Sequence, residues 1–262
     1  MVIAVAVLLG VVQGLTEFLP ISSSGHLRLV AAIFGIAEPQ TVFDVCVHAG
    51  TLGAVVAVYR KEVWAVITAL LRPSWKSHAF RLGVYMLVGT VPAGLVGVLF
   101  GELFETQFAS VNTVGMFLII NGAILQASRG RGQTGRDLES ITLRDAIIIG
   151  LAQSFALFRG ISRSGTTITT ALVIGVKRDA AAAFSFLLSI PAISGAVILK
   201  TSDALQAPEM ATTPLLIGTV AAALSGYVAL TYLVRLVRSG QFHQFGWYCW
   251  LAGGLAVGMS FI

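Results

Sequence analysis

The chain contains long apolar runs that no charged residue interrupts. Five of them are 20 to 25 residues long, enough for a helix to cross a hydrocarbon core of about 30 Å. A sixth run, residues 45–59, is shorter. The five long runs are 82–101, 106–128, 180–199, 210–234 and 239–262. This pattern predicts six transmembrane helices and therefore an all-α, polytopic membrane protein.

The composition supports the same class of protein. Of the 262 residues 56% are apolar and only 11% are charged, whereas a soluble domain carries about a quarter charged residues. This excludes a soluble α/β enzyme, a disordered chain and a soluble nucleic-acid-binding module. Cys46 and Cys249 both lie inside apolar segments, so we expect small buried side chains rather than a disulfide or a metal site. We expect one membrane domain over residues 1–262.

The net charge of +5 reflects topology and does not require an anionic partner. Thirteen of the 17 basic residues lie in four connections: 60–81, 129–144, 177–178 and 235–238. The alternate connections are mainly acidic. The positive-inside rule then places the basic connections in the cytoplasm. We therefore expect a multi-pass protein of the inner (plasma) membrane, with both termini outside and no nucleic-acid partner.

Two segments outside the long runs resemble each other. Residues 10–25 read GVVQGLTEFLPISSSG and residues 150–165 read GLAQSFALFRGISRSG, with seven identities at an offset of 140. The chain is thus expected to consist of two homologous halves, about 1–128 and 140–262. Three spans follow each segment, and an odd number inverts the second half in the membrane. The expected architecture is an inverted-topology repeat with two re-entrant, broken helical hairpins, in which sites form where the breaks meet.

The first break carries a carboxylate beside several hydroxyl groups. Gln13 and Glu17 are four residues apart and share one helical face. Pro20 ends that helix, and Ser22, Ser23 or Ser24 can begin the next one, close to His26. Exposed N–H groups at a helix N-terminus, together with hydroxyl groups, favour anion binding.

The second break adds a guanidinium group at an equivalent helix start. Arg163 suits bidentate recognition of phosphate, and its neighbours Ser162, Ser164 and Thr167 supply hydroxyl groups. Two structural alternatives stay open from the residues alone. Hydroxyl groups in membrane helices often bond only to backbone carbonyls, and Glu17 and Arg163 could form an ion pair without a ligand.

QGLTEFLPISSSGH at 13–26 and GISRSGTT at 160–167 resemble the two signature motifs of the undecaprenyl pyrophosphate phosphatase family of the bacitracin-resistance type. The resemblance extends over essentially the whole chain. It implies hydrolysis of undecaprenyl diphosphate to undecaprenyl phosphate and inorganic phosphate, which recycles the lipid carrier for cell-wall glycans, at a site that opens to the outer face.

The resemblance also implies roles for residues of both breaks. Glu17, Ser23, His26 and Arg163 are the expected catalytic residues, with Ser23, His26 or water as nucleophile. A divalent cation, Mg²⁺ or Ca²⁺, is expected at Glu17 and Gln13. The expected substrate contacts are Gln13, Ser22, Ser24, Ser162, Ser164 and Thr167.

Two positions depart from the family pattern. Arg159 stands where the second motif has proline, and Arg28 stands where an apolar residue is expected. Arg159 could bring a second cation to the phosphate site. The partners expected are an isoprenyl diphosphate lipid, the bilayer and a second copy of the chain in a homodimer. The alternative function is a transporter or flippase of polyprenyl phosphate lipids, because broken helices in inverted repeats are typical of alternating access.

Overall fold

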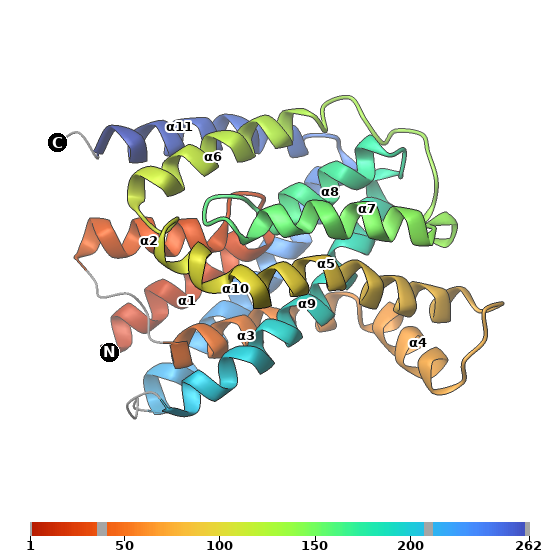
Figure 1. Cartoon of the computed structure of the whole chain (residues 1–262), viewed down its shortest axis with the longest axis horizontal. Helices are drawn as coiled ribbons and strands as arrows, with labels where there is room; N and C mark the ends of the chain where they lie inside the picture. The colour runs from red at the N-terminus through yellow and green to blue at the C-terminus, as the bar shows by residue number, and fades with distance from the viewer. Residues whose placement is uncertain (1, 36–40, 207–211, 260–262) are drawn as a thin grey trace.

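The computed structural model describes residues 2–35, 41–206 and 212–259 (Figure 1). These residues form α-helices and short 3₁₀ turns, with a single isolated β-bridge between Arg136 and Val176. The α-helices are α1 (Ile3–Phe18), α2 (Ser23–Phe34), α3 (Thr41–Val58), α4 (Arg60–Leu71), α5 (His78–Thr106), α6 (Val111–Gln126), α7 (Leu143–Ser154), α8 (Arg163–Val173), α9 (Arg178–Gln206), α10 (Thr212–Arg238) and α11 (Phe245–Met259). The all-α class is confirmed.

Four helices are long and apolar enough to cross a membrane: α3, α5, α9 and α10. They contain the predicted runs 45–59, 82–101, 180–199 and 210–234 almost entirely. The runs 106–128 and 239–262 contain the shorter helices α6 and α11. The chain is therefore a polytopic helical membrane protein, whereas the number of six crossings stays a prediction.

The basic connection after α3 is largely helical. It forms α4, which packs against the first part of α5 at one edge of the molecule (Figure 1). Only Val66 of α4 is buried, and Trp64 and Leu71 are largely exposed. The charges at Arg60 and Lys61 interrupt the apolar run, so the pattern of uninterrupted apolar runs does not predict this helix.

Helices from the two halves of the chain pack against each other in a crossed arrangement. Helix α1 lies along α10, α7 lies along α5, and α6 lies along α11 (Figure 1). At two of these crossings glycine allows the backbones to touch. Gly10 of α1 meets the carbonyl of Gly218 in α10, and Gly150 of α7 meets that of Gly89 in α5, so a Cβ at either position would collide. Neither half therefore buries its first helix by itself.

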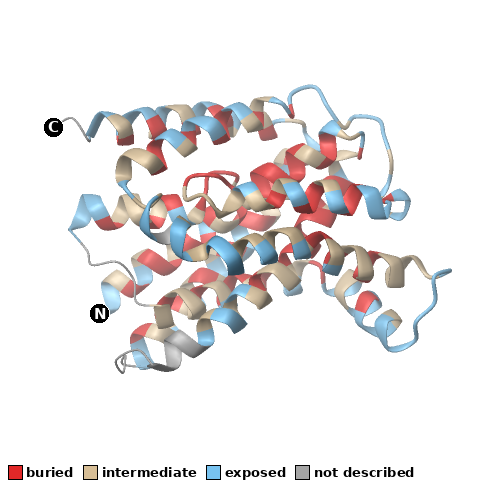
Figure 2. Cartoon of the chain, viewed as in Figure 1, coloured by how far each residue is buried: buried red, intermediate tan, exposed pale blue. Residues whose placement is uncertain are grey.

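Buried residues gather around the two chain breaks and α8, and exposed ones cover the outward sides of the surrounding helices (Figure 2). Eight of the eleven residues of α8 are buried, many of them hydroxyl-bearing. In contrast, large apolar side chains of α5 such as Leu87, Val91 and Leu95 are exposed. A polar centre with an apolar exterior is the distribution expected when the surrounding medium is lipid.

Candidate active site

Each break starts a new helix because a serine satisfies the free N–H groups at its N-terminus. Leu19 and Pro20 end α1, and Ser22 then adopts a positive φ of 71° as the N-cap of α2. In the second break Ser162 caps α8, and its hydroxyl accepts a hydrogen bond of 3.1 Å from the N–H of Gly165. Serine caps are present at both helix starts, and both capping serines are buried.

The two breaks are joined by direct hydrogen bonds. The N–H of Gly160 donates to the Ser22 hydroxyl at 3.0 Å, and the Ser164 hydroxyl donates to the carbonyl of Phe18 at 2.8 Å. Gly160 has a φ of 112° and lies against the backbone of α6, where a Cβ would collide. These contacts supply the protein partners that irregular backbone needs inside a membrane.

Asn121 connects both breaks from a third element, α6. Its side-chain amide donates to the carbonyl of Pro20 at 2.8 Å, and its Oδ1 accepts from the N–H of Ser162 at 3.0 Å. The side chain is completely buried. One amide therefore fixes the position of one break relative to the other.

Glu17 is the centre of a buried polar cluster. Its Oε1 accepts from Nη2 of Arg163 at 3.0 Å, and its Oε2 accepts from the Ser23 hydroxyl at 2.7 Å and from Nε2 of Gln13 at 3.1 Å. The side chains of Glu17 and Arg163 are only 8% and 14% exposed. The cluster thus joins one residue of the second break to three of the first.

Two atoms of this cluster have no partner among the described residues. Nη1 of Arg163 and Oε1 of Gln13 are buried and make no hydrogen bond. Unsatisfied buried polar atoms are uncommon in proteins and call for a ligand, a water or an ion. A purely structural ion pair would not need these two unpartnered atoms. They leave one strong donor, Nη1 of Arg163, and one acceptor, Oε1 of Gln13, free for a bound molecule.

The other expected site residues surround the cluster or lie apart from it. Thr167 bonds to the carbonyl of Arg163 at 2.8 Å and to the Ser185 hydroxyl at 2.5 Å, so it supports α8 from inside. His26 lies apart from Glu17. Its Nδ1 bonds to the carbonyl of Ser22 at 2.9 Å and its Nε2 to the Tyr248 hydroxyl at 2.7 Å.

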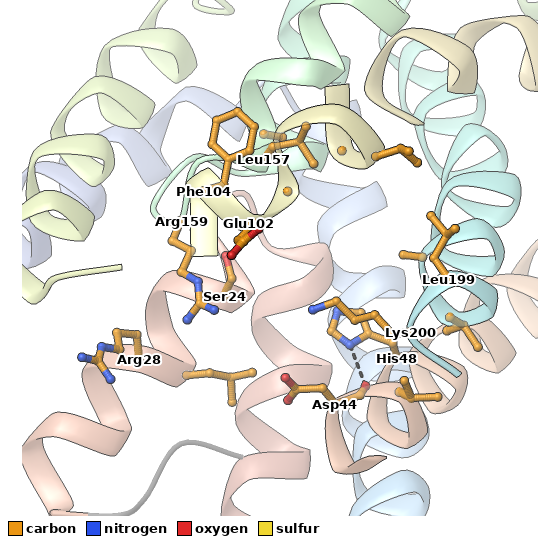
Figure 3. A pocket seen from close by; sticks show the side chains of 18 residues that line it. Ser24, Arg28, Asp44, His48, Glu102, Phe104, Leu157, Arg159, Leu199 and Lys200 are labelled. Atoms are coloured by element: carbon orange, nitrogen blue, oxygen red, sulfur yellow. Dashed lines mark hydrogen bonds between the residues drawn. The ribbon is translucent and has the colours of Figure 1, made fainter. Parts of the chain in front are cut away.

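A cavity of about 670 Å³ lies next to the cluster (Figure 3). Ser24 and His48 line it, and Nε2 of His48 is 4.0 Å from Oε2 of Glu17, so the cavity reaches the edge of the polar cluster. Its wall is largely apolar, with side chains from α5 and α9 such as Val98, Val197 and Leu199. An amphipathic molecule could place a polar end near Glu17 and an apolar end along this wall.

The polar cluster around Glu17 offers only a few side-chain ligands for a metal ion. Among the described residues there is no group of three His, Cys, Asp or Glu side chains that could hold one. Glu17 and the free Oε1 of Gln13 supply two oxygen atoms. Mg²⁺ commonly uses one or two protein oxygens and takes its remaining ligands from phosphate and water, so the pair fits an ion shared with a phosphorylated substrate.

Three residues of the site were missed or left undecided by the sequence alone: Asn121, Ser185 and His48. Asn121 is the amide within the apolar run 106–128 that bridges the breaks, and a buried amide in such a run is a usable signal. Ser185 carries no distinctive sequence signal, because small hydroxyl residues are frequent in membrane helices.

Known proteins resemble the chain over nearly its whole length. A family model described as "Bacitracin resistance protein BacA" matches residues 6–255. A relative named "Undecaprenyl-diphosphatase" from Halothermothrix orenii is 41% identical over 249 residues, which are 94% of each chain. Relatives of the same name from Desulfatibacillum aliphaticivorans and Korarchaeum cryptofilum are 40% and 41% identical and cover 98% and 97% of each chain. The chain therefore belongs to the BacA family of bacitracin resistance proteins.

Proposed function

We propose that the chain hydrolyses undecaprenyl diphosphate to undecaprenyl phosphate and inorganic phosphate. The observation that carries this function is the Glu17 cluster, in which a buried carboxylate contacts a hydroxyl and a guanidinium retains a free donor. The names of the relatives supply the substrate class. Family membership also favours hydrolysis over the transporter or flippase alternative.

Arg163 binds the phosphate that is attacked. Phosphoryl transfer depends mainly on positioning and on neutralising negative charge. Nη1 of Arg163 is free, while the ion pair through Nη2 holds the guanidinium in place. The hydroxyl groups and N–H groups at the start of α8 lie in the same break and can contact the remaining phosphate oxygens.

Glu17 acts as the general base that accepts the proton of the nucleophile. Its Oε2 lies 2.7 Å from the Ser23 hydroxyl, within the distance at which a general base receives a proton. When Ser23 attacks the terminal phosphorus, the P–O bond to the prenyl monophosphate breaks, the proton of Ser23 passes to Glu17, and water then hydrolyses the phosphoserine to release inorganic phosphate. In the direct alternative, a water held at the same carboxylate attacks the terminal phosphorus and expels the prenyl monophosphate in one step. His26 bonds to the Ser22 carbonyl and the Tyr248 hydroxyl and makes no contact with Glu17, whereas the Ser23 hydroxyl does, so Ser23 is the better supported nucleophile.

A divalent cation, Mg²⁺ or Ca²⁺, would be held by Glu17 and Gln13 together with the phosphates of the substrate. When bound, it would neutralise part of the charge on the diphosphate. Gln13 would orient it through Oε1, and Glu17 would contribute carboxylate oxygen.

The membrane arrangement belongs to the same proposal. Six helices cross the membrane and the hairpins α1–α2 and α7–α8 enter it as inverted repeats, with the cavity open to the outer face of the plasma membrane. The crossed packing of α1 on α10 and of α7 on α5 supports this arrangement, because the equivalent glycines Gly10 and Gly150 both make close backbone approaches there. The expected homodimer stays a prediction.

Phosphate release from farnesyl and undecaprenyl diphosphates tests the function. The detergent-solubilised wild-type chain should release phosphate, and EDTA should suppress the release. Glu17→Ala should abolish it while leaving a folded protein. Glu139→Ala removes an exposed carboxylate from a connecting segment and is the matched control. A pure carrier would release no phosphate, and wild-type turnover by Glu17→Ala would remove the carboxylate from the mechanism.

A further inference from the structure

Arg159 lies on the wall of the cavity outside the Glu17 cluster. It follows Phe158 in the second break, and its guanidinium lies on the same side of the cavity as Arg28 and Ser24 (Figure 3). Arg163 is absent from the lining of this cavity. The two arginines of the second break therefore lie in different places: Arg163 belongs to the Glu17 cluster, and Arg159 lines the cavity beside it.

The backbone that carries Arg159 is held from both sides. The ring of Phe158 stacks on Phe117 with centroids 4.5 Å apart and meets Phe104 edge-on at 4.8 Å. On the other side, Gly160 donates to the Ser22 hydroxyl at 3.0 Å. The guanidinium is thus presented from a fixed loop, which lowers the entropic cost of binding a ligand.

Within the described residues Arg159 makes no hydrogen bond and no ion pair. Glu102 and Asp44 also line the cavity, but neither is within ion-pair distance of Arg159, and Lys200 and His48 lie on the wall as well. Arg28 is oriented by a hydrogen bond of 3.0 Å from its Nε to the carbonyl of Ala109. Arg159 is thus a partly buried guanidinium without a protein acceptor on a cavity wall, and a cation in such a position in a membrane protein marks a candidate ligand site.

We propose that Arg159, with Arg28 and Ser24, forms a second phosphate-binding subsite, separate from the one at Arg163. This proposal rests on the proposed function. Ser24 follows Ser23 directly, so a diphosphate whose terminal phosphate lies at Ser23 and Arg163 extends its second phosphate toward the cavity. The apolar wall then takes the isoprenoid. The ligand group is a phosphate, carried either by the prenyl monophosphate product or by free inorganic phosphate.

Binding to the full-length, detergent-solubilised chain tests the subsite without requiring turnover. The two probes are farnesyl monophosphate and inorganic phosphate, titrated in separate arms. Arg159→Gln should weaken binding of farnesyl monophosphate about tenfold, the effect of losing one charge-assisted contact. A loss confined to inorganic phosphate would support the subsite and assign it to the free product.

Two further variants show whether a loss of binding is specific to the guanidinium of Arg159. Arg159→Pro should weaken binding as Arg159→Gln does. Two requirements of proline are met there: Phe158 before it is extended with ψ 124°, and the N–H of Arg159 makes no hydrogen bond among the described residues. Arg144→Gln removes an exposed cation elsewhere and should leave both affinities unchanged. Melting temperatures of all three variants establish that they are folded.

Unchanged affinity for both probes in folded Arg159 variants would overturn the subsite, as would an equal loss in Arg144→Gln. Phosphate release by the wild-type chain is measured separately. Release without an Arg159 effect on binding would refute only the subsite. An Arg159 effect on binding without any release by the wild type would refute only the proposed hydrolysis.

Discussion

Replacing Asn121 by alanine removes a buried side chain of α6 that bonds to the backbone of both breaks. The carbonyl of Pro20 and the N–H of Ser162 lose partners at 2.8 and 3.0 Å. A buried backbone group left without a partner costs about 1–3 kcal/mol. The carbonyl of Pro20 keeps a weak contact of 3.7 Å from Cys249 Sγ. The cost of removing its bond to Asn121 therefore lies at the lower end of that range. We expect Asn121→Ala to lower the free energy of unfolding by about 2–4 kcal/mol.

The effect on catalysis should exceed the effect on folding. Asn121 does not line the cavity or touch Glu17, but it sets the separation between Ser23 and Arg163 through the two breaks. A displacement of about 1 Å at reacting groups can reduce turnover about a hundredfold. The reduction should therefore persist at temperatures where the variant is fully folded.

The assay pairs denaturant unfolding in detergent with phosphate release. Asn112→Ala is the matched control, since Asn112 lies on the same helix and its side chain makes no hydrogen bond among the described residues. Asn121→Asp keeps an acceptor for Ser162 but places a buried carboxylate oxygen against the carbonyl of Pro20, so it should not recover the lost stability. Equal unfolding free energies for Asn121→Ala and Asn112→Ala, or full turnover by Asn121→Ala, would refute the bridging role.

Three further outcomes are expected. Arg163→Lys keeps the charge but loses the planar fork, so kcat/KM should fall at least about tenfold without a matching fall in melting temperature; near-normal kinetics would contradict the phosphate contact. Gln13→Glu should retain phosphate release and strengthen Mg²⁺ dependence, because it adds a carboxylate beside Glu17; loss of release would mean that the amide N–H is required. Asp145→Asn should lower the melting temperature, since it breaks the paired contacts of 2.6 and 2.8 Å from Arg136 that hold the start of α7, while KM stays unchanged; an unaltered melting curve would show that the pair adds nothing.

The sequence predicts the breaks well because their signals are local. Pro20 and the serine caps at Ser22 and Ser162 interrupt and restart helices through contacts within a few residues. An ion pair between Glu17 and Arg163 was one of the alternatives that the sequence left open. It was considered because a charged side chain inside a membrane is usually paired with an opposite charge. The helix breaks therefore follow from local sequence, whereas the Glu17–Arg163 contact joins residues 146 positions apart and stayed an alternative until the structure showed it.

Contacts between distant segments could not be predicted in this way. His26 is turned toward Tyr248, a partner 222 positions later, and Asn121 bonds to residues of both breaks. Nothing in the neighbouring sequence specifies these pairings. The helix α4 was missed for another reason: after the charges at its start, its charge-free part is only residues 63–71, too short to be recognised as a membrane span.

The crossed packing of α1 on α10 sets an order of events during synthesis. Helix α10 begins about 190 residues after α1 ends, and a ribosome adds about 5–20 residues per second. For roughly 10 to 40 seconds the first hairpin, with its buried carboxylate, must wait in or beside the bilayer without its partner. Nascent chains halted before α10 should therefore expose Gly10 and Gly14 to lipid or to an insertion factor, and a crosslinker placed there would trap whatever protects them.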